Sequence, residues 1–379
     1  MQYRVFGKTG VEVSALGFGA MRLPIISGDY SKIDEAEAIK MIRYAIDNGV
    51  NYVDTAYPYH EGQSEIVVGK ALKDGYREKT YLATKLPSWL INEKEDMDKY
   101  LNEQLKKLDV DYIDFYLLHA LDKERWEKYK RLDVFSWMEK VKKEGKVKFI
   151  GFSFHDEYNV FKGIIDDYDK WDFCQIQYNY MDINNQAGLK GLKYAASKGL
   201  GVIIMEPIRG GKLAGDPPEA IKELWNSASV KRTPAEWALQ WVWNHPEVSL
   251  VLSGMSTMEQ VKQNIESASR SRANGLSEDE VNLVNKVRET YKKLSPVGCT
   301  ACNYCMPCPN CVNIPKNFAI YNESHMYNNY NESLRNYNNL NEGKASSCVE
   351  CGECETKCPQ HLTIIDYLKD VRKYFKDAV

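Results

Sequence analysis

Residues 51–65 read NYVDTAYPYHEGQSE, residues 82–87 read LATKLP, and residues 111–121 read DYIDFYLLHAL. Each stretch begins as a short apolar run typical of a buried strand and then changes to polar or charged residues. In a barrel of alternating strands and helices, side chains at the carboxyl ends of the strands point into the active site, whereas the opposite face mainly serves stability. The three stretches therefore place Asp54, Tyr59, Lys85 and His119 at one mouth of such a barrel.

The same alternation of apolar runs and helical periodicity extends outward to fill residues 1–290. Eight runs in a segment of this length fit a closed α/β barrel of the (β/α)8 TIM type, which usually needs roughly 250 residues. A hairpin around Lys8-Thr9-Gly10 is expected to precede the barrel and cap its floor. The expected barrel strands are Leu16–Ala20, Asn51–Asp54, Tyr81–Thr84, Ile113–Leu117, Phe149–Ser153, Phe173–Gln177, Gly201–Met205 and Ser249–Ser253.

The composition indicates a globular chain with more than one module. The chain has 379 residues, 44% of them hydrophobic, and a formal net charge of −3. Because no long run of one charge sign occurs, we expect neither a nucleic-acid partner nor binding to an anionic membrane surface. No run approaches the roughly 20 apolar residues of a membrane span, and the start MQYRVFGKTG lacks the apolar core of a signal peptide. We expect a cytoplasmic protein that acts on a small molecule.

The polar residues at the predicted mouth resemble the catalytic tetrad of the aldo-keto reductase family. The supporting segments GFGAMRLP, GFSFH, QIQYNY and VKQN follow in order, and the resemblance covers about residues 1–290. It implies an oxidoreductase that uses NADPH or NADH to reduce a carbonyl, or the reverse alcohol oxidation. In the implied roles, Tyr59 is the general acid, Lys85 lowers its pKa, Asp54 positions Lys85, and His119 orients the substrate.

The chemistry of carbonyl reduction explains why these residue types belong together. A phenol with an ordinary pKa near ~10 is a poor acid unless its neighbours favour the anion, and a lysine held by a carboxylate does so. Taken singly, Asp54 is more simply read as a turn cap, Lys85 as a surface residue and His119 as a buried structural histidine, and it is their joint occurrence after successive strands that favours the tetrad. Tyr57 lies two positions before Tyr59, and the family pattern favours Tyr59.

The resemblance also implies a set of cofactor-binding residues, with departures from the family pattern. Phe154 replaces the usual Asn, and Met205 stands where an aromatic ring often covers the nicotinamide, although a thioether can still do so. Gly254 and Gln260 occupy positions where NADP-specific members often place cations, and Lys262 is a weak substitute, so NADPH leads NADH only narrowly. The implied cofactor residues are Gly19, Met21, Ser153, Gln175, Met205, Gln260, Gln263 and Asn264.

Three further residues follow strand ends and are candidates for an altered substrate pocket. His60 and His155 lie just beyond the second and fifth expected strands, and each reads alternatively as a simple loop residue. Trp89, four residues after Lys85, is expected to line the same pocket.

Nine of the ten cysteines follow Ser295, in the strings CTACNYCMPCPNC and CVECGECETKCPQ. The second string matches the bacterial ferredoxin run, in which the cysteine before Pro ligates the other cluster. Zinc sites usually use paired cysteines, so two [4Fe–4S] clusters are favoured over zinc. One expected ligand set is Cys299, Cys302, Cys305 and Cys358; the other is Cys308, Cys348, Cys351 and Cys354.

The first string departs from the ferredoxin run because only two residues, not three, separate Cys305 from Cys308. Cys311 is therefore an alternative ligand, although Pro309 supports Cys308. Cys174 lies in an expected strand and is read as a small buried apolar residue. The Asn- and Tyr-rich residues 322–343 are expected to form a surface excursion with little core.

These patterns predict a barrel over residues 1–294 and a ferredoxin-like domain over residues 295–379, as in the aldo-keto reductases that carry such a tail. The clusters serve either structure or electron transfer. An alternative function is a ferredoxin-coupled oxidoreductase in which the barrel exchanges electrons with the clusters through a flavin, with ferredoxin or another redox protein as partner. A non-catalytic redox sensor is a third reading, against which retention of all four tetrad residues argues.

Overall fold

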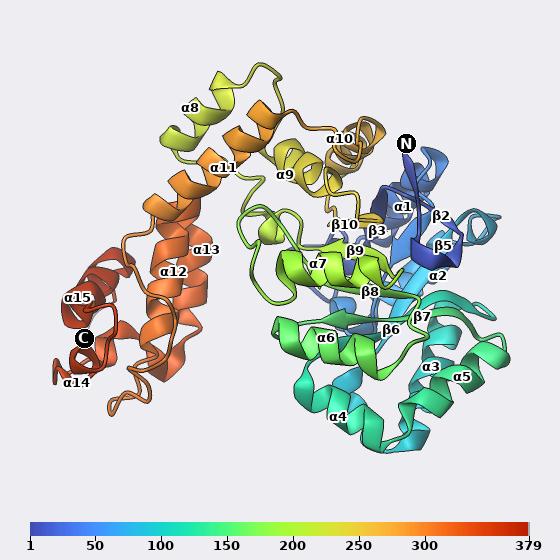
Figure 1. Ribbon diagram of the computed structural model, residues 1–379, viewed down its shortest axis with the longest axis horizontal. Helices are drawn as coiled ribbons and strands as arrows, with labels where there is room; N and C mark the ends of the chain where they lie inside the picture. Colours follow the sequence, from blue (N-terminus) through green and yellow to red (C-terminus); the bar gives the residue numbers. More distant parts are fainter. Residues whose placement is uncertain (378–379) are drawn as a thin grey trace. The chain divides into compact units, whose positions relative to one another are not determined.

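The computed structural model describes residues 1–377, which pack into two compact units (Figure 1). The first unit comprises residues 1–210 and 236–278, and the second comprises residues 211–235 together with the chain from residue 279 onward. The segment after the seventh barrel strand therefore packs with the second unit although it lies between barrel elements in sequence. The expected domain boundary after residue 294 stays a prediction.

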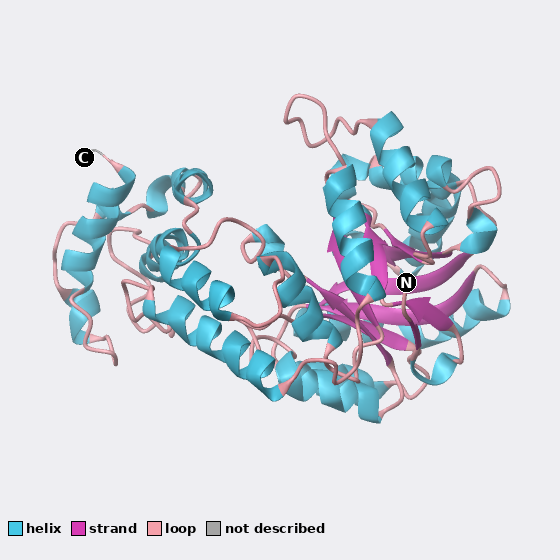
Figure 2. Cartoon of the chain, turned by 90° about the horizontal axis from the view of Figure 1, so that it is seen from above, coloured by secondary structure: helices cyan, strands magenta, loops and turns pink. Residues whose placement is uncertain are grey.

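The first unit is a closed barrel of parallel strands, in the spatial order β10-β3-β4-β5-β6-β7-β8-β9, which confirms the predicted (β/α)8 fold. Figure 2 shows the strands gathered in a magenta core with helices outside it. The strands are buried almost throughout, as expected for a parallel sheet covered by helices. The barrel strands are β3 Leu16–Gly19, β4 Tyr52–Asp54, β5 Tyr81–Leu86, β6 Ile113–Leu121, β7 Val147–Phe154, β8 Phe173–Gln177, β9 Gly201–Met205 and β10 Leu250–Gly254.

A hairpin precedes the barrel, as predicted. Strands β1 (Tyr3–Val5) and β2 (Glu12–Ser14) pair antiparallel. Between them, Phe6 is fully buried and packs with barrel residues, including the ring of Phe115 at a centroid distance of 4.9 Å. The hairpin thus closes the floor opposite the predicted active-site mouth.

The helices of the first unit follow their strands in the alternation expected from periodicity. They bury one apolar face each, for example Met41 and Ile42 of α1. The helices are α1 Glu35–Asp47, α2 Ser64–Ala71, α3 Lys94–Leu108, α4 Lys123–Arg131, α5 Val134–Lys143, α6 Tyr158–Asp167, α7 Gly188–Ser197, α9 Pro234–Trp243 and α10 Met258–Ser269.

The second unit is helical and has its own apolar core. That core includes Val312, Ile314, Phe318, Leu368 and Val371, and most of the clustered cysteines pack against it. Its helices are α8 Glu219–Ser227, α11 Glu278–Lys293, α12 Ile314–Tyr327, α13 Tyr330–Asn338, α14 Glu353–Thr356 and α15 Ile364–Phe375.

The prediction that residues 322–343 form a surface excursion is wrong. This segment completes α12 and forms α13, with Tyr327 and Tyr337 buried. The Tyr337 ring stacks on Phe375 of α15 at a centroid distance of 4.6 Å. The tyrosines supply the apolar surface that the many asparagines lack, because a phenol ring buries a large area while its hydroxyl keeps a polar partner.

No helix in residues 1–377 is long and apolar enough to cross a bilayer.

Candidate active site and cysteine cavities

The four predicted catalytic residues meet at the carboxyl ends of neighbouring strands. Asp54 ends β4, Lys85 lies near the end of β5, and His119 lies near the end of β6. Parallel pairing aligns Asp54 with Ala83 and carries Lys85 alongside Leu117. Tyr59 starts the short 3-10 helix that follows β4. Strand register therefore gathers residues that are far apart in the sequence.

Lys85 is fully buried and its ammonium donates three hydrogen bonds. The acceptors are Asp54 Oδ1 at 2.7 Å, the carbonyl oxygen of Thr55 at 2.8 Å and the Tyr59 hydroxyl at 3.3 Å. An ammonium has three donors and no acceptor, so this arrangement satisfies the cation completely. Because the Tyr59 oxygen accepts from Lys85, its own O–H is free to point elsewhere.

The pKa shifts in this cluster have opposing causes. Burial raises the pKa of Tyr59 above its usual value, although Lys85 opposes the effect. As the resemblance implied, Lys85 acts to lower this pKa, but desolvation outweighs the lysine because the phenolate loses its water. For Lys85, burial lowers the pKa, but Asp54 and Tyr59 together outweigh it and the net shift is upward. Tyr59 thus keeps its proton and Lys85 its charge at neutral pH.

His119 completes the mouth as a neutral imidazole. Burial, followed by the nearby charge of Lys85, holds its pKa well below the usual range. Its ring lies 6.2 Å from that of Tyr59 and 5.1 Å from that of Trp89, measured between centroids. Trp89 is 39% exposed. Trp89, predicted to line the pocket, thus lies beside the His119 imidazole.

His60 has a structural place rather than one in the pocket. It is 1% exposed, and its Nε2 accepts a hydrogen bond of 3.1 Å from the Leu23 N–H while Nδ1 lies 2.8 Å from the Tyr30 carbonyl oxygen. These partners require the neutral tautomer with the proton on Nδ1. Through these two hydrogen bonds, His60 holds the loop after β3 next to the segment that contains Tyr59. His155, by contrast, is exposed at the end of β7.

Three predicted cofactor residues lie on adjacent strands. Ser153 of β7 pairs in register with Gln175 of β8, and the Gln175 amide nitrogen lies 3.4 Å from the Met205 sulfur. The Gln175 Oε1 atom is buried and has no hydrogen-bond partner among the described residues. Ser153 Oγ accepts from the Ala120 N–H at 2.7 Å, which leaves its own proton to donate.

These free groups fit a primary carboxamide. Its NH2 would donate to Gln175 Oε1, and its oxygen would accept from the Ser153 hydroxyl. A buried acceptor left without a donor costs about 1–3 kcal/mol, so the orphan oxygen favours a ligand there. Phe154 does not interfere, because its ring packs outward on Phe161 of α6 at 5.1 Å.

The remaining predicted cofactor residues surround the end of β10. Gly19 pairs with Gly254, and a side chain at Gly19 would approach the Ser253 carbonyl oxygen to 3.2 Å. Met21 is 50% exposed in the 3-10 helix after β3. The other three make local bonds: Gln260 accepts from Ser256 N, Gln263 donates to Glu259, and Asn264 donates to Ser253 Oγ.

A buried hydrogen-bond network behind Lys85 was not anticipated from the sequence. The Glu65 Oε1 atom accepts from Thr84 Oγ1 at 2.7 Å and from Gln104 Nε2 at 2.5 Å. Gln104 Nε2 also donates to the Lys85 carbonyl oxygen at 3.0 Å, and burial raises the pKa of Glu65. The network holds the backbone of β5 at the catalytic lysine. The sign of this network in the sequence was Glu65, the single carboxylate in the first turn of α2.

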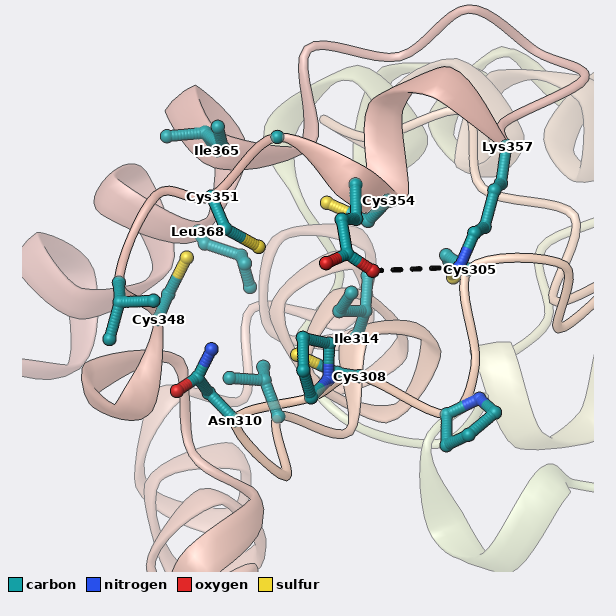
Figure 3. A pocket seen from close by; sticks show the side chains of 16 residues that line it. Cys305, Cys308, Asn310, Ile314, Cys348, Cys351, Cys354, Lys357, Ile365 and Leu368 are labelled. Atoms are coloured by element: carbon teal, nitrogen blue, oxygen red, sulfur yellow. Dashed lines mark ion pairs between the residues drawn. The ribbon is translucent and has the colours of Figure 1, made fainter.

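In the second unit, the cysteines of both strings line two cavities. The first cavity contains Cys308 beside the three leading thiols of the second string, and Figure 3 shows Cys308, Cys348, Cys351 and Cys354 around one space. The second cavity is lined by Cys299, Cys302, Cys305 and Cys358. The structure thus brings together both predicted sets, with the cysteine before Pro exchanged between strings.

The two cavities share a wall. Cys305 and Ile314 line both cavities. Within residues 1–377 no three metal-ligand side chains converge on a single point; the thiols ring each cavity instead. Cys311 is exposed and belongs to neither lining.

Comparison with known proteins agrees with the fold and identifies the family. A model of the aldo/keto reductase family matches residues 15–289, and a model of the 4Fe-4S dicluster domain matches residues 298–363. The chain belongs to the aldo/keto reductase family and is an oxidoreductase. It combines the family's barrel with a C-terminal 4Fe-4S dicluster domain, as the cysteine strings predicted.

Individual relatives cover most of the chain. It is 30% identical to L-galactose dehydrogenase of Arabidopsis thaliana, over 78% of this chain and 97% of that protein. It is 28% identical to the oxidoreductase YrpG of Bacillus subtilis, over 70% of this chain and 90% of that protein. Among solved structures, the holo form of an aldo-keto reductase from Bacillus halodurans matches with a TM-score of 0.62 and 28% identity, over 76% of this chain and 96% of that one.

Proposed function

We propose that the chain reduces the carbonyl group of a small molecule with a nicotinamide cofactor, or oxidises the alcohol in reverse. The observation that carries the proposal is the buried Lys85 ammonium, which bonds both to the Asp54 carboxylate and to the Tyr59 hydroxyl. Carbonyl reduction needs a proton at oxygen as hydride reaches carbon. A protonated phenol beside a fixed cation supplies that proton and stabilises the phenolate that remains.

Each tetrad residue has one task in this proposal. Tyr59 gives its proton to the carbonyl oxygen, and Lys85 then faces the phenolate. Asp54 keeps Lys85 in place and charged. His119, neutral because it is buried, donates an N–H to the same oxygen and orients the substrate. Trp89 borders the space where the rest of the substrate lies.

The chain offers a suitable place for the cofactor. Gln175 Oε1 and the Ser153 hydroxyl would hold the nicotinamide carboxamide, with the Met205 thioether beside them. When bound there, the nicotinamide supplies the hydride that the carbonyl carbon accepts. Its redox chemistry belongs to the cofactor, and these residues provide position and orientation. We propose NADPH in preference to NADH as the cofactor.

We assign one [4Fe–4S] cluster to each cysteine cavity of the dicluster domain. Cys308, Cys348, Cys351 and Cys354 would bind one, and Cys299, Cys302, Cys305 and Cys358 the other. Two clusters exceed what a small domain needs for folding, since one structural metal commonly suffices. Electron transfer to a redox protein such as ferredoxin is therefore preferred to a purely structural role, in a reducing compartment such as the cytoplasm.

Exposure of the cysteines supports a second candidate, a ferredoxin-coupled oxidoreductase. Cys302 and Cys351 are exposed, one in each cavity, so a partner protein could approach either cluster closely. A nicotinamide transfers two electrons together and each cluster accepts one, so this function needs a converter such as a flavin.

A single preparation tests both candidates. The full-length chain is purified without oxygen, its released small molecules are identified by mass spectrometry, and NADPH or NADH is added with and without small aldehydes. Aldehyde-dependent oxidation of the nicotinamide supports the first function. Bleaching of the iron–sulfur absorption without aldehyde, together with released FMN or FAD, supports the second. If neither response is observed with any aldehyde or alcohol tried, both proposed functions are wrong.

A further inference from the structure

The segment that carries Tyr59 continues in a backbone conformation that most residues avoid. His60 and Glu61, which follow Tyr59, have φ angles of 51° and 54°, and Gly62 has a φ of 90°. Residues with a Cβ atom adopt this left-handed region at a cost in free energy, because the Cβ crowds the following carbonyl oxygen. Such a conformation persists where surrounding contacts hold it. The position of the Tyr59 hydroxyl therefore depends on what packs against residues 57–62.

Two side chains hold this segment. His60, within the segment, anchors it to the loop after β3. Lys107, in the last turn of α3, contacts it from the helix. The Lys107 ammonium lies over the ring of Tyr57 at 3.9 Å from the centroid, and a Cβ atom at Gly62 would lie 3.7 Å from the same nitrogen. The lysine thus contacts the chain on both sides of Tyr59 in sequence.

The Lys107 ammonium is itself held in place by two carboxylates. Glu103 Oε1 lies 3.2 Å from the nitrogen, and Glu65 Oε2 lies 3.8 Å from it. Glu65 is fully buried, and its Oε2 atom accepts no hydrogen bond within residues 1–377. The attraction between this carboxylate and the ammonium is strong because little water screens it. With its side chain only 20% exposed, Lys107 is a fixed part of the packing rather than a solvated surface lysine.

The same face of α3 also reaches Lys85. Gln104 lies three residues before Lys107, a spacing that puts both side chains on one face of the helix. The Gln104 Nε2 atom donates to the Lys85 carbonyl oxygen at 3.0 Å. One helix face thus contacts the strand that carries Lys85 and the segment that carries Tyr59, and these two side chains meet in the hydrogen bond of 3.3 Å.

We propose that Lys107 is a positioning residue, which keeps the Tyr59 hydroxyl within hydrogen-bonding distance of the Lys85 ammonium. The inference rests on the proposed role of Tyr59 as the proton donor. Lys107 acts through the Tyr57 ring and the backbone of residues 57–62, and the reaction itself is left to the tetrad. The arrangement is sensitive because the bond of 3.3 Å is already long, and a separation of about 3.6 Å is no longer a hydrogen bond.

The experiment measures steady-state reduction of a small aldehyde by the full-length, cluster-replete chain, together with its affinity for NADPH. Lys107→Met removes the charge and keeps an apolar stem, whereas Lys107→Arg keeps the charge and can still lie over an aromatic ring. The matched control is Lys106→Met, because Lys106 is exposed on the same turn of α3. Hydrogen exchange of residues 57–62 reports on the segment itself.

Lys107→Met is expected to lower kcat about 10- to 100-fold, since a small misplacement of a reacting group costs up to that much. The KM for the aldehyde and the affinity for NADPH should stay near wild type, because the proposal gives the lysine no contact with either ligand. Hydrogen exchange of residues 57–62 should become faster. Lys107→Arg should recover most of the turnover, and Lys106→Met should match wild type in every measurement.

A double-mutant cycle with Tyr59→Phe separates positioning from general support of the fold. If Lys107 acts through Tyr59, Lys107→Met should have no further effect once the Tyr59 hydroxyl is gone. A lysine that merely supports the fold would lower turnover by the same factor in both backgrounds. Tyr57→Leu removes the ring from the other side of the contact and should repeat the pattern of Lys107→Met, whereas Tyr57→Phe keeps the ring and should keep turnover.

The negative results are distinguishable. If wild type reduces the aldehyde and Lys107→Met does so equally fast, the inference is wrong while the proposed function survives. Equal losses in the two backgrounds of the cycle, or unchanged hydrogen exchange of residues 57–62 in Lys107→Met, also overturn the inference alone. If wild type reduces no aldehyde tried, or if Tyr59→Phe retains wild-type turnover, the proposed function itself fails and the inference falls with it.

Discussion

The Lys85 ammonium donates a hydrogen bond of 3.3 Å to the Tyr59 hydroxyl, although Lys85 lies in β5 and Tyr59 follows β4. The same ammonium is held by Asp54 at 2.7 Å. A buried pair of this kind is costly to assemble, because both charges lose water. Its presence at the mouth of the barrel, rather than in the apolar floor, is the reason that we propose this cluster as the catalytic centre.

Tyr59→Phe should reduce carbonyl turnover about 10²- to 10⁴-fold, since loss of a positioned acid typically costs that much. Dinucleotide affinity should stay unchanged. The matched control is Tyr57→Phe, because Tyr57 donates to Glu103 at 3.1 Å and its pKa is raised to about 12, chiefly by burial. Steady-state rates with a small aldehyde check both. Near-normal turnover of Tyr59→Phe, or collapse of Tyr57→Phe, would contradict the assignment.

The pH profile of reduction should be flat through neutrality. Burial raises the pKa of Tyr59, so its proton is present below the ordinary tyrosine range and lost only above it. Burial holds the pKa of His119 well below 6.5, so no histidine limb should appear between pH 6 and 8, roughly the range where an ordinary histidine titrates. We expect kcat/KM to fall only above about pH 10. An acidic limb near pH 6.5 that disappears in His119→Asn would contradict this prediction.

Cys348→Ser should remove about half of the iron and sulfide from oxygen-free protein, since two four-iron clusters need separate ligand sets. Cys311→Ser is the control and should retain all of it, because Cys311 is exposed and lines neither cavity. Iron and sulfide analysis, with the visible absorption spectrum, measures both. Loss of iron in Cys311→Ser, or tightly bound zinc with little iron in wild type, would be incompatible with the assignment.

The Leu23 amide should lose protection from hydrogen exchange as the pH falls. His60 accepts from this amide only when neutral, and burial lowers its pKa from 6.5. Its stabilising bond is therefore present above pH 6.5 and is lost as the pH falls through the lowered value. Hydrogen exchange of residues 20–33, corrected for intrinsic rates, is compared at neutral and mildly acidic pH. His60→Gln should abolish the pH dependence, whereas His155→Gln should preserve it; the same dependence in both variants would refute the role of His60.

Much of the fold was predictable because its signals are local. The apolar runs that end at Asp54 and Lys85 placed two strands, and strand direction then placed both residues at one mouth. Spacing alone also grouped the cysteines, because the ferredoxin run repeats at fixed intervals. For residues 322–343 the prediction from composition was wrong. Composition shows that the segment is rich in asparagine, but it cannot show that Tyr337 stacks on Phe375.

The sequence by itself predicted the barrel and the two cysteine strings, because periodicity and spacing act within a few residues along the chain, and its resemblance to the aldo-keto reductases implied the tetrad. Tertiary structure alone decided which side chains are buried and what they face. It raised the pKa of Tyr59 by burial, set Glu65 behind Lys85 through Gln104, and laid Lys107 over the ring of Tyr57. These relationships join residues distant in sequence, and their energies depend on desolvation and packing, which exist only once the chain has closed on itself.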